Sequence, residues 1–192
     1  MARPRTHDDA LRRRLLEAAS TAVADGGPAS LSLRSVAAAA GTTTAAVYSL
    51  FGGRTALVDA VVAEGFRRFA THLDAVPRTD DPLADLLALG VAYRANALEN
   101  PHFYRVMFET VGAEGRDGDR GAAAPTFAVL REAVARAFGT GQDESEAVAV
   151  RLWALAHGLV SLELAGLLPG GTQERAERYV AALRGDGPTA RT

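Results

Sequence analysis

The chain has 192 residues, of which 48% are hydrophobic and 23% are charged, and its formal net charge is −2 at neutral pH. A chain of this length can bury a full hydrophobic core, and the composition is that of an ordinary globular protein. It contains no cysteine, which excludes disulfides, thiolate metal sites and a cysteine nucleophile and suits a reducing cytoplasm. No apolar run reaches the roughly 18 residues that span a membrane, and the charged N-terminus is unlike a secretory signal. We therefore expect a cytoplasmic protein without a membrane segment.

The charge is unevenly spread along the chain. All 21 basic residues are arginine, and residues 1–54 hold seven of them against four acidic residues, a balance of +3. The rest of the chain therefore carries −5. A basic first third on an acidic body indicates a negatively charged partner for that third alone. An excess of three charges is also what a solvated surface can carry, so both interpretations stay open.

Apolar residues recur at helical spacing through the first third of the chain. The spacing predicts helices over about 8–25, 33–40 and 43–50, and a longer helix from Arg54 to about Val76. Ser32 is placed to cap the second helix, and Gly41 to end it in the left-handed conformation. The pair Gly52-Gly53 breaks the chain before the long helix.

The remaining two thirds also read as helical. A polar link over 77–82 is followed by predicted helices, which are expected over about 83–99, from Pro101 onward, 122–139, 144–168 and 172–184. The glycine-rich stretch 112–121 is predicted to be a mobile link, and 186–192 a disordered tail. No strand pattern occurs, so the expected fold class is all-α. We expect two domains, over 1–54 and 55–185.

The stretch "GTTTAAVYSLFGGRTAL", residues 41–57, carries the strongest functional signal. Two short helices that meet at Gly41 form a helix-turn-helix, whose second helix lies in the major groove of DNA. Val47, Leu50 and Phe51 are expected to face the protein core. The residues expected to face DNA are Ser32, Arg34, Thr42, Thr43, Thr44, Ala45, Ala46, Tyr48, Ser49 and Arg54.

These side chains suit both the backbone and the bases of DNA. Threonine hydroxyls can cap the helix, bond a phosphate or meet a base, and the methyl groups can touch a thymine methyl. Tyr48 can give its hydroxyl to a phosphate, although a lone tyrosine on a short helix is more often half-buried core. Arg54 opens the next helix, whose first amides already favour an anion. For Arg12, Arg13 and Arg14, a solvated helix face is the favoured interpretation.

The segment "SLRSVAAAAGTTTAAVYSLFGGRTALVDAVV" resembles the DNA-binding region of the tetracycline-repressor (TetR) family, and the resemblance covers about residues 8–62. It implies a three-helix DNA-binding domain over 1–54, a palindromic double-stranded operator, a homodimer, and a helical effector-binding and dimerisation domain over 55–185 that binds a small molecule. Ligand binding would shift the body and the helix that starts at Arg54, so that DNA is released. Thr44 stands where the family often has lysine, so phosphate contacts are expected to depend more on Arg3, Arg5, Arg34 and Arg54.

The C-terminal body contains "RLWALAHGLVSLELAGLL", residues 151–168. Trp153, His157 and Gly158 resemble the Trp…His-Gly (WHG) signature of one C-terminal subgroup of the family. An aromatic lining with a few polar groups is what a small-molecule pocket needs, although plain core packing explains any single aromatic equally well. The expected effector-binding residues are Tyr93, Phe103, Tyr104, Met107, Phe108, Phe127, Trp153 and His157.

Other classes of function receive little support. The four histidines lack metal-binding spacing, there is no G-x-S-x-G motif, and the glycines of 112–121 lack the lysine of a phosphate loop. No catalytic residue, metal or cofactor is therefore predicted, and the chain is not expected to be an enzyme. The favoured function is a repressor released by a small, mostly apolar effector. The alternative is a helical small-molecule carrier or adaptor that has lost DNA binding.

Overall fold

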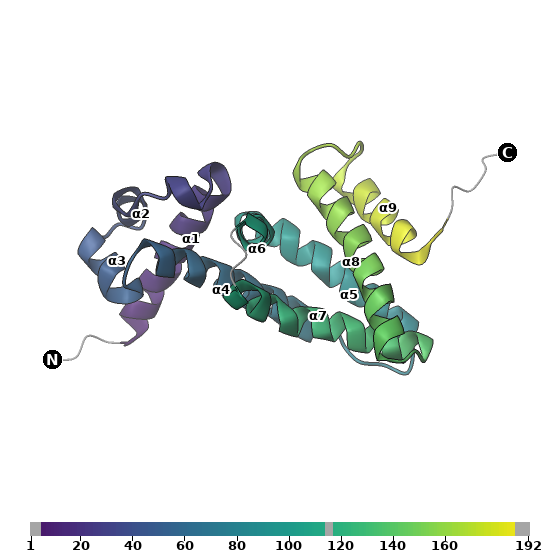
Figure 1. The fold of residues 1–192 in the computed structure, drawn as a ribbon. Helices are drawn as coiled ribbons and strands as arrows, with labels where there is room; N and C mark the ends of the chain where they lie inside the picture. The colour runs from purple at the N-terminus through teal and green to yellow at the C-terminus, as the bar shows by residue number, and fades with distance from the viewer. Residues whose placement is uncertain (1–4, 114–116, 187–192) are drawn as a thin grey trace. The chain divides into compact units, whose positions relative to one another are not determined.

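The computed structural model describes residues 5–113 and 117–186, with side chains over 8–108 and 124–186. Over these residues the chain forms helices and no strand, which confirms the all-α prediction (Figure 1). The elements are α1 (Arg5–Gly26), the 3-10 turn η1 (Pro28–Ser30), α2 (Leu33–Ala39), α3 (Thr44–Phe51), α4 (Arg54–Asp74), α5 (Pro82–Glu99), α6 (Pro101–Ala113), α7 (Asp117–Phe138), α8 (Gln142–Leu164) and α9 (Thr172–Arg184).

The helices group into two compact units that are discontinuous in sequence. The first unit combines residues 1–68 with 100–123, and the second combines 69–99 with 124–192. The chain therefore passes between units after Arg68 inside α4, at the junction of α5 and α6, and inside α7. The domain boundary expected near residue 54 separates two functions rather than two compact units, and it stays a prediction.

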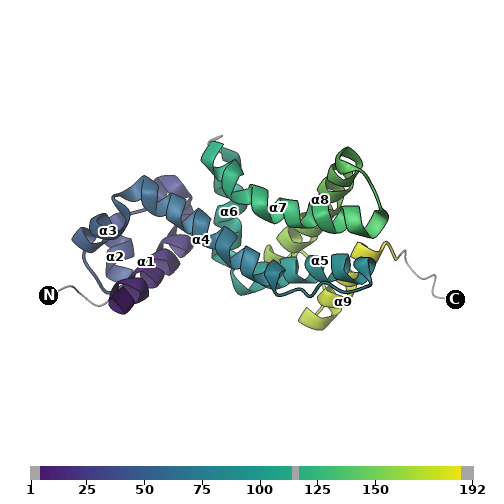
Figure 2. The same cartoon turned by 90° about the horizontal axis from the view of Figure 1, so that it is seen from below.

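The first unit is built around α1, which packs against α2, η1 and α6. Figure 2 shows α1 beside α2. Leu15 of α1 and Leu57 of α4 are fully buried, and α6 contributes Phe103 and Met107 at 2% and 1% exposure. Gly65 lets α6 approach α4 closely, because a β-carbon there would lie 2.6 Å from Met107 Cγ. Burying such side chains contributes about 1.5–3 kcal/mol each, so α6 is an integral part of this unit.

The second unit is built on α5, α8 and α9, each of which packs against the other two. Tyr179 of α9 donates a hydrogen bond to the Gly90 carbonyl of α5 at 2.8 Å. Arg94 of α5 donates two hydrogen bonds to the Glu163 carboxylate of α8, at 2.7 and 2.6 Å. Arg175 of α9 adds a second cation, with its Nε 3.4 Å from the same carboxylate. One buried carboxylate therefore connects all three helices.

The predicted link over 112–121 is wrong where it can be assessed. Helix α6 continues to Ala113 and α7 begins at Asp117, so most of this stretch is helical and α7 contains Pro125 in its interior. A glycine costs about 1 kcal/mol in a helix, and this propensity is weak enough for the surrounding structure to override. Residues 114–116 lie outside the described residues, as does the predicted tail beyond Asp186.

Candidate DNA interface and effector site

Local caps define the two helices of the helix-turn-helix. The hydroxyls of Ser32 and Thr43 accept hydrogen bonds from the amides of Ser35 and Ala46, both at 3.3 Å, and start α2 and α3. Gly41 follows α2 with φ 65°, and Gly52 ends α3 in the left-handed conformation with φ 83°. A side chain is strained at such φ angles, so a glycine follows each helix of the helix-turn-helix, as predicted for Gly41 after α2.

The inner face of α3 is held by apolar packing and by an arginine of α1. Val47 is fully buried, and Leu50 and Phe51 are half-buried, as expected. The Arg12 guanidinium lies 3.4 Å from the Leu50 carbonyl and 4.6 Å from the centre of the Phe51 ring. Arg14 donates to the Ala40 carbonyl at 3.2 Å. Both arginines are exposed, as predicted, but they also contact the partly negative ends of α3 and α2.

The face of α3 that was expected to meet DNA is open to solvent. Of the ten predicted residues, Thr42 and Ala46 are half-buried and the other eight are exposed. Tyr48 is 57% exposed, which argues against its alternative role as a core tyrosine. The Arg54 side chain bonds back to η1, with Nη2 2.5 Å from the Pro28 carbonyl and also bonded to that of Ala29. A phosphate contact by Arg54 would therefore use its remaining donors.

Four of the expected effector-binding residues lie in the first unit and pack together on α6. Phe103, Tyr104 and Met107 are at most 4% exposed. Tyr104 meets Phe108 edge-on with ring centres 4.9 Å apart, and Phe108 meets Phe66 at 6.4 Å. In the described state Phe103, Tyr104 and Met107 are core, and Phe108 is half-buried beside them.

The other four expected effector-binding residues lie in the second unit and form a chain of contacts. The Tyr93 hydroxyl lies 3.0 Å from Nδ1 of His157. The rings of Trp153 and His157 are 6.4 Å apart, and those of Phe127 and Trp153 are 5.9 Å apart. Burial lowers the pKa of His157, which favours the neutral imidazole near neutral pH. Trp153 is 37% exposed, so this cluster offers apolar rings, a hydroxyl and an imidazole near the surface.

A separate cleft of about 270 Å³ opens in the second unit, and it contains none of the eight expected residues. It is lined by Leu73, Asp74, Val76, Pro77, Arg78, Asp85, Leu89, Val129, Glu132, Ala133 and Arg136. Asp85 accepts hydrogen bonds from the Thr79 hydroxyl and amide at 2.6 and 2.8 Å and is paired with Arg136. The Thr79 bonds, helped by Arg136, lower the pKa of Asp85. Aromatic residues in the sequence do not indicate this cleft, because its lining is aliphatic and charged.

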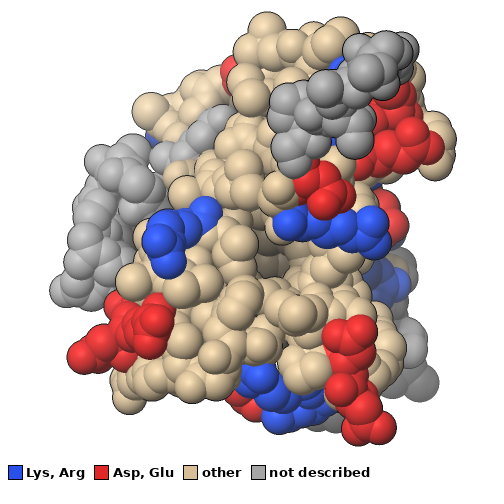
Figure 3. All heavy atoms as spheres, turned by 90° about the vertical axis from the view of Figure 1, so that its right-hand side faces the viewer, with Lys and Arg blue, Asp and Glu red and all other residues tan. Residues whose placement is uncertain are grey.

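Helix α8 carries an exposed apolar face. Leu155 and Leu162 are 40% and 42% exposed, and a β-carbon on Gly158 between them would meet nothing within 4 Å. Figure 3 views the side on which α8 and α9 lie in Figure 1, and uncharged groups cover most of that surface. By length and composition, α8 could cross a membrane, as could the α3–α4 pair if its 65° bend is counted as one span. Only 22% of the apolar window of α8 is buried, so this helix leaves much apolar surface uncovered.

Within the described ranges, no group of three or more histidine and acidic side chains is placed to hold a metal ion. The features that remain are a capped recognition helix with an exposed polar face and a second helical unit with apolar surface. They define a DNA-binding protein of the helix-turn-helix class.

Two family profiles identify the particular group. The profile described as "Bacterial regulatory proteins, tetR family" matches residues 15–61. A second, described as "Tetracyclin repressor-like, C-terminal domain", matches residues 86–183, which is more than half of the chain. The chain belongs to the TetR family of transcriptional regulators.

Solved structures share the fold over nearly the whole chain. A protein of unknown function from Rhodococcus sp. RHA1 is 28% identical, with 91% of this chain and 94% of that chain covered and a TM-score of 0.72. A TetR family transcription regulator from Marinobacter aquaeolei VT8 is 22% identical, with 94% and 97% covered and a TM-score of 0.74. AibR, in complex with isovaleryl coenzyme A and operator DNA, is 20% identical, with 90% and 97% covered and a TM-score of 0.71. At their lower identities, the last two support the fold alone. No curated protein matches the sequence.

Proposed function

We propose that this regulator is a cytoplasmic repressor that binds a palindromic operator as a homodimer and is released by a small, mostly apolar effector. The observation that carries the DNA-binding part is the exposed face of α3, where Tyr48 is 57% exposed while Val47 beneath it is fully buried. A helix held in this way can enter a major groove without distortion of its own fold. Nothing in this function calls for a catalytic residue, a metal or a cofactor.

The DNA contacts proposed for α3 follow from its exposed residues. Thr44, Ala45 and Ser49 would meet base edges or phosphates, and Tyr48 would donate its hydroxyl to a phosphate. Thr43 already accepts a hydrogen bond from Ala46, so its hydroxyl proton is what remains to be donated to DNA. The remaining proposed contacts come from the start of α2, the turn and the start of α4: Ser32, Arg34, Thr42, Ala46 and Arg54.

A second copy of the chain is the proposed partner of the α8 face. Leu155 and Leu162 lie two turns apart on one side of α8, and Gly158 between them leaves room for another helix to approach. Burying two leucines from each copy removes apolar surface from water. A twofold dimer formed there would match the symmetry of a palindromic operator.

The effector is proposed to bind at the second-unit cluster formed by Tyr93, Phe127, Trp153 and His157. The rings supply an apolar surface, and the Tyr93–His157 pair supplies hydrogen-bonding groups for a few polar atoms. Trp153, His157 and Gly158 are also the residues that resemble the WHG signature. The fold neighbour AibR has been seen with isovaleryl coenzyme A and operator DNA, which supports a small-molecule effector here. Phe103, Tyr104, Met107 and Phe108 remain predicted contacts only for a state in which α6 is displaced.

The test is selection of bound fragments from a random DNA pool, with wild-type protein, Tyr48→Ala and Thr21→Ala in parallel. Thr21 is an exposed hydroxyl residue of α1 whose side chain bonds the Glu17 carbonyl of its own helix, so it serves as the control. We expect wild type and Thr21→Ala to enrich the same palindrome and Tyr48→Ala to lose it. Enrichment should weaken steeply as salt rises, because phosphate contacts release counterions. Absence of enrichment by wild type at low salt would instead favour the carrier or adaptor.

A further inference from the structure

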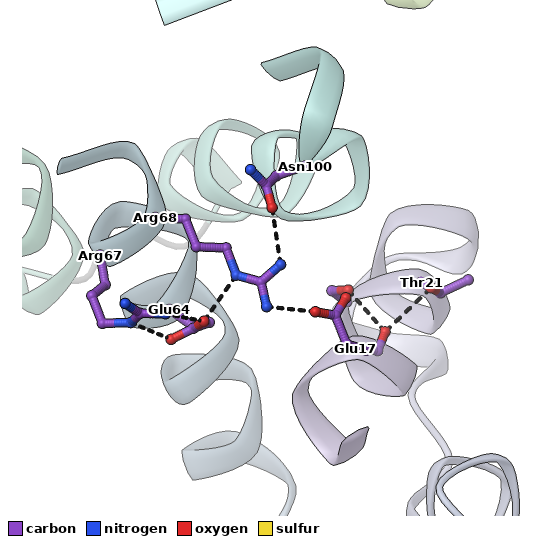
Figure 4. A network of polar contacts seen from close by, with 7 residues as sticks. Glu17, Thr21, Glu64, Arg67, Arg68 and Asn100 are labelled. Carbon is purple, nitrogen blue, oxygen red and sulfur yellow. Dashed lines mark hydrogen bonds and ion pairs between the residues drawn. The ribbon is translucent and has the colours of Figure 1, made fainter. Parts of the chain in front are cut away.

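Arg68 of α4 bonds three different segments of the first unit (Figure 4). Its Nε lies 2.8 Å from Oε1 of Glu64 on the same helix, and its Nη1 donates to Oδ1 of Asn100 at 2.9 Å. Its Nη2 donates to Oε1 of Glu17 on α1 at 2.5 Å. The guanidinium also lies 4.0 Å from the centre of the Phe103 ring on α6. One side chain, only 20% exposed, thus connects α1, α4 and α6.

This cluster lies where the chain leaves the first unit and where it returns. Arg68 is the last residue of the first unit before the chain enters the second, and Asn100 is the first residue after it returns. The hydrogen bond between them therefore joins the two residues that flank the whole 69–99 segment, and this pair is called the base of the segment. Asn100 also begins α6, since its carbonyl accepts the amide of Tyr104 at 2.9 Å. Through Glu17, the same arginine ties this base to α1, whose Arg12 contacts Leu50 and Phe51 of the recognition helix.

The charges in the cluster favour a fixed geometry. Hydrogen bonds from Arg67 and Arg68 lower the pKa of Glu64 despite its partial burial, so the carboxylate stays ionised. A planar guanidinium offers donors in fixed directions and keeps its charge, so it can hold three acceptors in one arrangement. Phe103 lies against the cation and is itself 2% exposed, which limits the alternatives open to the side chain.

We propose that Arg68 is a positioning residue for operator binding. Its side chain fixes α1 to the two chain segments that lead into the second unit, which are α4 at Arg68 and the start of α6 at Asn100. It does not touch DNA; it sets how firmly the DNA-reading helices are held. The inference rests on the proposed regulator function and adds to it a specific residue through which DNA affinity is set.

The experiment compares Arg68→Met with Arg67→Met. Methionine keeps an apolar stem against Phe103 and removes the three donors. Arg67 is the matched control, because it bonds the same Glu64 carboxylate within α4 and is 65% exposed. Binding to the operator fragment found by selection is measured by fluorescence anisotropy across a series of salt concentrations. Hydrogen exchange of α1 peptides is measured on the same free proteins.

We expect Arg68→Met to weaken operator binding by roughly 2- to 30-fold, the range found for residues that carry coupling between sites. The salt dependence should stay that of wild type, because loss of a phosphate contact would lower the slope by about one. The α1 amides around Glu17 should exchange faster, Arg67→Met should match wild type, and Arg68→Lys should recover part of the affinity.

Three outcomes would overturn the proposal: operator affinity within twofold of wild type, a lowered salt slope, or unchanged α1 exchange. If Arg68→Met does not fold, Asn100→Ala replaces it, because that change removes the Oδ1 that accepts from Arg68 Nη1 and should produce the same loss of affinity in smaller degree. An effect no larger than that of Arg67→Met would then overturn the proposal. If the wild type enriches no DNA at all, the regulator function itself is refuted. If the wild type binds DNA and both arginine variants bind it normally, only the role of Arg68 is refuted.

Discussion

Replacing Glu163 by glutamine should destabilise the second unit strongly. The Glu163 side chain is 5% exposed, and it faces two cations, Arg94 at 12% and Arg175 at 25% exposure. Glutamine keeps the shape but removes the charge and presents an amide to two guanidinium groups. Removing one partner of a buried ion pair costs about 3–5 kcal/mol. Since Arg175 retains some access to water, we expect a loss near the lower end, about 3 kcal/mol.

Urea unfolding followed by Trp153 fluorescence measures this loss locally, because the single tryptophan lies on α8 with Glu163. Glu174→Gln is the matched control: its ion pair with Arg178 joins side chains that are 53% and 51% exposed, and such pairs contribute at most about 1 kcal/mol. Arg94→Met should cost less than Glu163→Gln, because Arg175 still lies 3.4 Å from the carboxylate. A loss for Glu163→Gln no larger than that of Glu174→Gln would refute the reasoning.

Three further predictions concern the recognition helix, the effector cluster and the dimer. Gly52→Ala should lower the free energy of unfolding by about 1–2 kcal/mol, because alanine is strained at φ 83°. Gly52→Asn should lower it less. Equal melting temperatures for wild type and both variants would contradict this. Burial lowers the pKa of His157, so the unfolded chain binds a proton more readily than the folded chain. The stability present above a pH of about 6.5 should therefore be lost as pH falls through the lower folded pKa. Urea midpoints for His157→Gln should decline less than those of wild type over that window, and parallel declines would contradict the lowered pKa of His157. Leu162→Glu should convert the proposed dimer to a monomer in sedimentation experiments. The monomer should still bind non-specific DNA through Tyr48. An unchanged mass would exclude the α8 face as the dimer interface.

The helices and their ends were largely predictable because local chemistry determines them. Ser32 and Gly41 mark the limits of α2 through a cap and a left-handed residue, and both roles are confirmed. Helix α9 spans the predicted residues 172–184. The 112–121 window failed because glycine content is a weak local signal, and here the helical state prevails over much of the stretch.

The site was predictable in outline and less so in detail. The exposed face of α3 follows from helical periodicity, which places Val47 inward and Tyr48 outward. The partners of long side chains do not follow from periodicity, so the bonds of Arg12 and Arg54 to main-chain carbonyls could not be anticipated. The aromatic residues of α6 stay predicted pocket residues although Phe103 and Tyr104 are buried here, because composition cannot distinguish a pocket lining from a core. Which unit each helix joins depends on long-range packing that the sequence pattern does not contain.

The discontinuity of the first unit limits how this protein can be divided for engineering. A chimera that grafts residues 1–54 onto another regulator's body would leave out α6, and with it Phe103 and Met107, which are almost completely buried in the first unit. The exposed apolar face of α1 would then have to be covered by whatever helix the recipient supplies. An exchange that keeps residues 5–68 together with 100–113, and replaces only the intervening 69–99 and the later helices, preserves that packing. Exchanging the second unit in this chain therefore needs three junctions, near Arg68, Asn100 and Ala113, rather than a simple fusion at a linker.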